Sequence, residues 1–301
     1  MLATALGPAI SEHLLDPGVS EIMLNADHRL WVDVLGAGRH DTGITIPPAD
    51  AQRIIGIVAS NSGFDCNEKK PILSAEMPDS GFRFQGMLPP LVQSPVFTIR
   101  KNAQFIYNLD DYVQQGILTV QQSTALRKAV RKKRNVLVVG GTGSGKTTLV
   151  NAILDEIAQT QDRIVIIEDT IELQCSAEDV VTLRARDGIA TMTDLLKATM
   201  RLRPDRIVVG EVRGGEALAL LKAWNTGHPG GAATIHANNA LAGLIRLEQL
   251  IQEVAVTVNR ELIAEAVNVI VYIERTAKGR IVKEICRVKG YVGGRYVTEP
   301  I

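Results

Sequence analysis

A glycine-rich run at residues 140–148, with the sequence GGTGSGKTT, constrains the fold of this chain more than any other feature. It follows an apolar run at residues 136–139 and precedes residues 149–158, whose apolar side chains recur at helical spacing. A buried strand, a glycine loop and a helix form the context in which the G-x-x-x-x-G-K-[ST] spacing builds a phosphate-binding loop. The alternative, a glycine-rich turn that happens to contain a lysine, leaves the complete spacing and both flanks unexplained.

The residue types of this run suit a nucleoside triphosphate. Glycines let successive backbone N–H groups point at an anion, and the following helix adds unpaired N–H groups and the positive end of its dipole. Lys146 can reach the β- and γ-phosphates, Thr147 offers a hydroxyl to Mg²⁺, and Thr148 lies on the α-phosphate side. We therefore expect ATP and Mg²⁺ as ligands. The predicted nucleotide-binding residues of the loop are Gly141, Thr142, Gly143, Ser144, Gly145, Lys146, Thr147 and Thr148.

The composition narrows the class of protein. At 301 residues the chain is long enough for two domains that each bury a core. Three widely spaced cysteines form no C-x-x-C pair, which fits a reducing compartment and argues against a zinc site. The sequence shows neither a signal-peptide pattern nor a run of about 20 apolar residues. We expect a cytoplasmic protein that could lie against a membrane through its partners.

The first third of the chain interleaves helical and strand-like runs irregularly. Residues 21–24 and 30–34 are strand-like and are joined by turn residues, as in a hairpin. We predict a small α+β domain over residues 1–104, followed by a polar linker over residues 105–118. The predicted helices of this domain are residues 6–15 and 49–60.

From residue 119 onward, strands and helices alternate. Thr119 is a candidate N-cap for the first of these helices. The strands are nearly continuous apolar runs, which is typical of a parallel sheet covered on both faces. We therefore predict an α/β domain over residues 119–301. The predicted strands are 136–139, 164–167, 180–183, 207–209 and 232–235. The later predicted helices are 193–202, 216–224, 240–252 and 259–266. The predicted final hairpin has arms 269–275 and 280–288 with a turn at 277–279.

Acidic residues follow two of the predicted strands. Glu168 and Asp169 end one strand, and Gly210 and Glu211 end another. Open α/β sheets place their sites at these carboxyl ends, and a nucleotide hydrolase needs one carboxylate for Mg²⁺ and one for the attacking water. Glu168 and Glu211 are therefore the candidates, with their individual roles left open. An N-cap or a surface charge is the alternative for Asp169.

Two histidines, His228 and His236, flank a glycine-rich turn and a short strand. Either could donate a hydrogen bond to the γ-phosphate. As zinc ligands they lack companions. A single histidine is more often structural, so the case for a role in the site is stronger for His236, beside the ligand edge of the sheet.

A basic run closes the helix that precedes the glycine loop, with the members Arg127, Lys128, Arg131, Lys132, Lys133 and Arg134. It indicates either a nucleic-acid patch or a solvated helix end whose cations offset the dipole. Thirty-three basic residues balance 33 acidic ones and only 4% of residues are aromatic, which makes direct nucleic-acid binding the weaker alternative. A RecA-like nucleic-acid motor and a docking module that binds ATP without turnover stay open as other classes of function.

Four motifs stand in a fixed order, GGTGSGKTT, IVIIEDTIEL, LRPDRIVVGEVRGGEA and TGHPGGAATIHANNA. Over about residues 135–239 they resemble the Walker A loop, acidic box, Walker B segment and histidine box of the type II and type IV secretion ATPases. The phrases GFRFQGMLPPL and FTIRK extend the likeness more weakly into the first half and are most similar to the TrbB-type ATPases of conjugative transfer. The chain lacks the four-cysteine insertion of many type II assembly ATPases, and pilus assembly or retraction ATPases remain an alternative.

The resemblance implies a hexameric ring that hydrolyses ATP with Mg²⁺ to power conjugative DNA transfer, pilus assembly or substrate translocation. Its partners would be inner-membrane components of the apparatus, with peripheral attachment to that membrane. It also implies a C-terminal RecA-like P-loop NTPase domain preceded by a smaller α+β N-terminal domain, with ATP between the two.

Site residues follow from the same resemblance. Arg83 and Arg100 match the arginines that neutralise charge on the γ-phosphate, although Arg83 could also be an ordinary exposed strand residue. Arg203, Arg206 and Arg213 are candidates for additional contacts or for subunit interfaces. The predicted catalytic residues are Glu211, Glu168, Lys146, Arg83, Arg100 and His236. The predicted Mg²⁺ ligands are Thr147, Glu168 and Glu211. His228 is a further predicted nucleotide contact.

Overall fold

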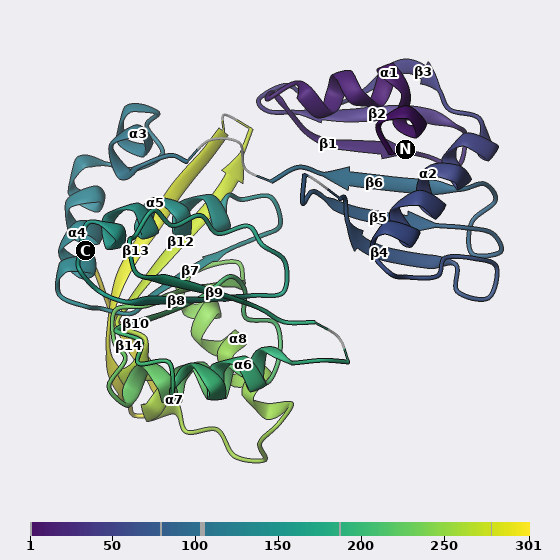
Figure 1. Cartoon of the computed structure of the whole chain (residues 1–301). Coiled ribbons are helices and arrows are strands. Elements are labelled where there is room, and N and C mark those ends of the chain that lie inside the picture. Colours follow the sequence, from purple (N-terminus) through teal and green to yellow (C-terminus); the bar gives the residue numbers. More distant parts are fainter. Residues whose placement is uncertain (1, 79, 103–105, 187, 278) are drawn as a thin grey trace. The chain divides into compact units, whose positions relative to one another are not determined.

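The computed structural model of the chain describes residues 2–78, 80–102, 106–186, 188–277 and 279–301. It divides into two compact units, Met1–Phe105 and Ile106–Ile301 (Figure 1). Each unit has its own sheet and its own hydrophobic core. Among the described residues, no helix combines the length and the apolar character needed to cross a bilayer.

The first unit is built on a single antiparallel sheet. Its helices are α1 (Leu2–Leu15) and α2 (Pro48–Asn61), and its strands are β1 (Val19–Leu24), β2 (Arg29–Val34), β3 (Gly38–Thr45), β4 (Ile72–Glu76), β5 (Arg83–Met87) and β6 (Val96–Arg100). The described residues form a six-stranded sheet in the order β3-β2-β1-β6-β5-β4. The predicted hairpin and both predicted helices are confirmed. Strand β3 is not among the predicted strands, because its residues are mostly polar and partly exposed.

The two faces of this sheet differ. Ile22, Phe84 and Ile99 are buried in the core that the sheet shares with α1 and α2. Residues that alternate with them point to the opposite face. In the strand register Arg100 lies between Glu21 and Arg83 on this opposite face, so the two predicted arginines are cross-strand neighbours.

The second unit carries the glycine loop. Its helices are α3 (Leu109–Gln114), α4 (Val120–Arg131), α5 (Lys146–Ala158), α6 (Met192–Thr199), α7 (Glu216–Asn225), α8 (Ala240–Gln252) and α9 (Arg260–Ala266). Its strands are β7 (Val136–Gly140), β8 (Ile164–Glu168), β9 (Val180–Arg184), β10 (Arg206–Val209), β11 (Ala232–His236), β12 (Val269–Thr276), β13 (Gly279–Val292) and β14 (Arg295–Pro300). The described residues form an eight-stranded sheet in the order β14-β13-β12-β7-β11-β10-β8-β9.

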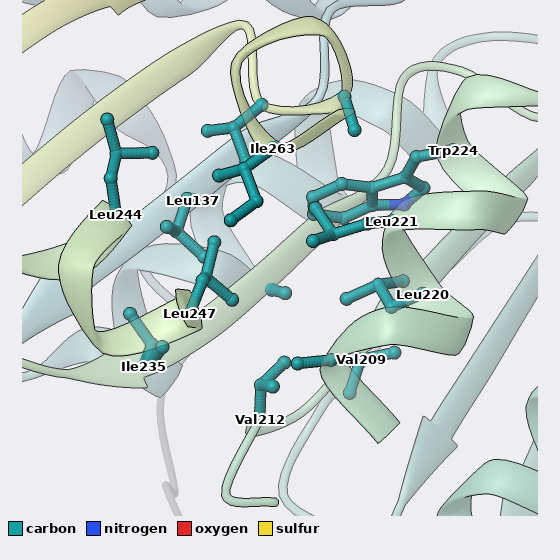
Figure 2. Packing of buried hydrophobic residues seen from close by; sticks show 14 of the residues in the cluster. Leu137, Val209, Val212, Leu220, Leu221, Trp224, Ile235, Leu244, Leu247 and Ile263 are labelled. Carbon is teal, nitrogen blue, oxygen red and sulfur yellow. The ribbon is translucent and has the colours of Figure 1, made fainter. Parts of the chain in front are cut away.

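The six strands from β12 to β9 are parallel, which confirms the parallel sheet predicted for five of them and adds β12, predicted only as a hairpin arm. Strands β7, β8 and β10 are buried on both faces. Alternate residues of β7 enter different cores, Leu137 on the side of α7, α8 and α9, and Val138 on the side of α4 and α5. Figure 2 shows the first of these cores, where Leu137, Val209 and Leu247 pack near Trp224. Because both faces are buried, the ends of the strands are where polar side chains can gather.

The predicted linker over residues 105–118 differs from the structure in its described part. Residues 106–118 belong to the second unit, where Leu109, Tyr112 and Leu118 are buried in the core beside α4 and α5. Asn108 and Asp111 form a capping box that starts α3. A single helical turn with so few apolar residues gives little periodic signal, so the sequence pattern resembled a linker.

The ends of other elements agree with the sequence pattern. Thr119 caps α4 in a capping box with Gln122, as predicted. The predicted final hairpin is present as β12 and β13, although Lys278 in its predicted turn lies outside the described residues. Strand β14 extends the sheet beyond this hairpin and is not among the predicted strands.

Candidate nucleotide site

Four parallel strands bring their carboxyl ends to one edge of the sheet, and the predicted site residues follow those ends. His236, the last residue of β11, is the register partner of Gly140 at the end of β7. Strand β10 pairs with β8, which ends at Glu168, and Glu211 follows β10 two residues after Val209. Parallel register therefore places the glycine loop, both glutamates and His236 along the same edge, called the carboxyl edge below.

The glycine loop has the backbone that its sequence predicts. Gly143 and Gly145 have φ angles of 70° and 95°, in the left-handed region that favours glycine, and Gly145 is the N-cap of α5. A Cβ atom on Gly140 would lie 2.4 Å from the carbonyl oxygen of Ile273, so the first glycine allows a close approach of β12. The loop thus leads directly into the amino end of α5, where anions bind favourably.

Lys146 is nearly buried, with 7% of its surface exposed, and its ammonium group points back toward the loop. Its Nζ donates a hydrogen bond of 3.0 Å to the carbonyl oxygen of Gly141. The same atom lies 3.3 Å from each ring nitrogen of His236. The positive charge is therefore held between the loop and the end of β11, within reach of a phosphate bound to the loop.

Glu168 presents one bonded and one open carboxylate oxygen. Its Oε1 accepts hydrogen bonds from the backbone N–H groups of Glu172 (3.0 Å) and Leu173 (2.9 Å). Its Oε2 is buried and has no hydrogen-bond partner among the described residues. Burial raises the pKa of Glu168 to about 7, against the lowering effect of the two backbone hydrogen bonds.

The residue before Glu211 is glycine, and the space around it leaves no room for a larger side chain. A Cβ atom at position 210 would lie 2.9 Å from Cγ of Glu168, inside the van der Waals contact distance. The Gly-Glu ending of β10 therefore makes room for the acid that ends the neighbouring β8.

Glu211 is held by two neighbours from different elements. Its Oε1 lies 2.7 Å from Nε2 of His236, and its Oε2 accepts a hydrogen bond of 2.8 Å from Nε of Arg213, which also pairs with Asp169. Burial and the Lys146 charge hold the pKa of His236 below its usual value, although Glu211 acts in the opposite direction. A neutral His236 can accept a hydrogen bond from Lys146 while its Nε2 lies beside Glu211, so the three side chains are neighbours at this edge.

The oxygen ligands at this edge suit Mg²⁺ shared with a nucleotide. Among the described residues, no group of three or more His, Cys, Asp or Glu side chains is arranged to hold a metal ion. Mg²⁺ is commonly bound through one or two protein oxygens together with phosphate oxygens and water. The hydroxyl of Thr147 and the carboxylate of Glu211 fit such an incomplete set, and the open oxygen of Glu168 fits a bound water.

His228 lies elsewhere, and the structure does not bring it to the carboxyl edge with the other predicted nucleotide contacts. It precedes β11, at the amino edge of the sheet, where its Nδ1 lies 2.7 Å from the carbonyl oxygen of Pro204. The rise of β11 from Ala232 to His236 is about 13 Å, and His228 precedes this strand. Arg206 is also at the amino edge and is fully buried there, so it is not a nucleotide contact.

Two of the six residues of the basic run form ion pairs within the protein. Arg127 pairs with Glu156 at 2.7 Å and with Asp110, while Lys133 pairs with Asp162 at 2.6 Å. These pairs favour a structural role for Arg127 and Lys133. Arg83 and Arg100 belong to the first unit, and their role in catalysis stays a prediction.

One neighbour of the glycine loop carries no motif signal. Arg280 on β13 places its Nε 3.5 Å from the carbonyl oxygen of Gly143 in the glycine loop. The two residues lie far apart in sequence, and an arginine after a turn is unremarkable in a hairpin. Only the pairing of β12 with β7 brings them together.

The chain is similar to known proteins over both units. The family described as type II/IV secretion system protein matches residues 53–290. Conjugal transfer protein TrbB of Rhizobium radiobacter is 51% identical over 300 residues, which cover 99% of this chain and 92% of that protein. Type IV secretion system protein VirB11 of Bartonella henselae is 31% identical over 296 residues, with 84% and 82% covered. The crystal structure of the VirB11 ATPase from the Brucella suis type IV secretion system has a TM-score of 0.53 and 26% identity, with 95% and 94% covered.

Proposed function

The chain belongs to the type II/IV secretion system protein family, and from this premise we propose that it is a Mg²⁺-dependent ATPase that powers a conjugative transfer or type IV secretion apparatus. The observation that carries the proposal is the contact of His236 with Lys146 and Glu211 at the edge where the glycine loop begins, with Glu168 ending β8 at the same edge. These side chains come from separate strands and motifs, and a phosphate site explains why they converge.

The residues have distinct roles in this proposal. Loop N–H groups and Lys146 hold the phosphates, and Thr147 and Glu211 supply oxygen ligands for Mg²⁺. When bound, Mg²⁺ neutralises charge on the phosphates. Glu168 orients the attacking water and accepts its proton through the open Oε2, for which a pKa of about 7 is well matched. His236 positions Glu211 and couples it to Lys146.

The first unit adds charge to the same reaction. Arg83 and Arg100 lie side by side on β5 and β6, so their guanidinium groups can act as a pair on one anion. We assign them to the γ-phosphate, where arginines stabilise the charge that develops in the transition state. A hexameric ring of RecA-like domains, with inner-membrane components of the apparatus as partners, completes the proposal.

Phosphate release from ATP tests the enzymatic part. We expect Lys146→Ala to lower turnover by at least about 100-fold, because the transferred phosphoryl group loses its nearest charge. Lys222→Ala removes an exposed lysine from the end of α7 and should leave turnover unchanged. The thermal midpoint of each variant checks folding. Full turnover by a folded Lys146→Ala protein would refute the proposal.

Activity as a function of protein concentration tests the assembly. If the catalytic site is completed by neighbouring copies, turnover per chain rises with concentration together with the native mass. In cells, the Lys146→Ala variant should fail to restore transfer in a strain that lacks the wild-type gene. Restored transfer would separate the secretion role from ATP hydrolysis and contradict the proposed motor.

A further inference from the structure

The β12–β13 hairpin flanks the glycine loop on the side away from the catalytic acids. Strand β7 lies between β11 and β12, and β12 pairs with it in parallel from Val269 to Tyr272. Beyond Tyr272 the hairpin continues past the start of the loop. Its last pairs include Arg275 opposite Arg280.

The two arginines share one face of the hairpin. Directly opposed residues of an antiparallel pair point the same way, and like charges in that position destabilise the pair. The next pair on the same face is Ile273 with Val282, which are buried in the core beneath α5. Arg275 and Arg280 therefore project on the side of the glycine loop, and both are exposed. Within the described parts of the chain, no carboxylate forms an ion pair with either one.

Arg280 packs directly on the loop. A Cβ atom on Gly145 would lie 2.9 Å from its Cδ and 3.2 Å from its Nε, so the glycine leaves just enough room for the arginine stem. The Nε atom lies 3.5 Å from the carbonyl oxygen of Gly143. The guanidinium is thus placed beside the residues whose N–H groups surround a phosphate.

The position of the acids fixes which end of a nucleotide this arginine faces. Glu168, Glu211 and His236 follow β8, β10 and β11, all on one side of β7. They mark the γ-phosphate end. The hairpin lies on the other side of β7, so the α-phosphate and ribose extend toward it.

We propose that Arg280 is a further nucleotide-binding residue, which contacts the α-phosphate side of the bound nucleotide, and that Arg275 adds to the positive field there. The proposal rests on the proposed ATPase function. It explains why an energetically unfavourable pair of arginines stands beside the loop without an acidic partner. A bound nucleotide supplies the missing negative charge.

Binding to the full chain tests the proposal, measured by calorimetry with ADP and with a non-hydrolysable ATP analogue in the presence of Mg²⁺. Arg280→Ala should weaken both ligands by the same factor, about 10- to 100-fold, because both contain the α-phosphate. Arg280→Lys should lose less, and Arg275→Ala should lose about threefold or less. A loss for the ATP analogue alone, or no loss for either ligand, would overturn the assignment.

Two controls separate the possible failures. Arg295→Ala removes an exposed arginine from the opposite end of the same sheet and should bind both ligands as wild type does. Arg280→Gln keeps the stem that packs on Gly145 and serves if Arg280→Ala does not fold. If the wild-type chain binds no nucleotide, the proposed function itself fails. A different pattern would overturn only the role of Arg280. In that pattern the wild type binds nucleotide, Lys146→Ala does not bind it, and Arg280→Gln binds it as the wild type does.

Discussion

The two edges of the sheet in the second unit use the same residue types in different ways. At the amino edge, Asp162 pairs with Lys133 and with the buried Arg206, whose guanidinium also donates to the carbonyl oxygens of Val130 and Gly230. At the carboxyl edge, Glu168 keeps an open oxygen in a buried position. The charged groups at the amino edge have their hydrogen bonds completed within the protein, whereas Glu168 at the carboxyl edge keeps an oxygen that can bind a ligand.

The ionisation of the two acids reflects this difference. Burial alone would raise the pKa of Asp162, but hydrogen bonds from Lys133 and Arg206 bring it below its usual value. Burial dominates at Glu168, and its pKa rises to about 7. A buried carboxylate with cationic partners stays ionised, and one without them can take up a proton near neutral pH.

The largest expected effect is on the free energy of unfolding and concerns Arg206 at the amino edge. We expect Arg206→Ala to lower the free energy of unfolding by about 3–5 kcal/mol, because it leaves Asp162 and two backbone carbonyl groups with fewer partners in a buried place. Urea unfolding measures the change. Arg287→Ala, which removes an exposed pair with Glu299, should cost less than about 1 kcal/mol. Equal costs for the two variants would contradict the contrast between the edges.

A second prediction concerns Glu168 in protein without nucleotide and with metal removed by a chelator. The folded pKa of about 7 exceeds the usual 4.5, so the folded state binds more protons than the unfolded state between these values. The free energy of unfolding should therefore fall as pH rises from 4.5 to 7, by on the order of 3 kcal/mol.

Glu168→Gln tests this pH dependence, because the amide cannot ionise. Urea unfolding at several pH values should show a smaller decline for the variant than for the wild type. Parallel pH profiles would mean that Glu168 ionises normally in the folded protein. The same variant should lower turnover by about 100-fold or more, since the water loses its base.

The smallest effect distinguishes the two histidines. His228→Ala should cost about 1 kcal/mol through the lost hydrogen bond to Pro204 and leave ATP binding unchanged. His236→Ala should instead lower turnover at least about tenfold, because Glu211 loses a positioning contact. Calorimetry measures ATP binding and phosphate release measures turnover for the two variants. A loss of nucleotide affinity in His228→Ala would place that residue in the site after all.

Much of the second unit could be predicted from sequence because its signals are local. The apolar runs became parallel strands, and the loop glycines took the conformations that their spacing requires. The structure places His228 at the other edge from His236, because proximity to a motif does not distinguish the residue before a strand from the one after it. Arg280 was beyond prediction, since its contact with Gly143 depends on which strand lies beside β7. The short helix α3 gave too little periodicity to be told from a linker.

The tight approach of Gly210 to Glu168 makes two positions in separate motifs interdependent in evolution. A larger residue at 210 requires the side chain of residue 168 to move or to be shorter, and a shorter side chain lacks the proposed base. Glycine is therefore needed at 210 as long as Glu168 keeps its present place, and the fitness effect of a change at 210 depends on what occupies 168.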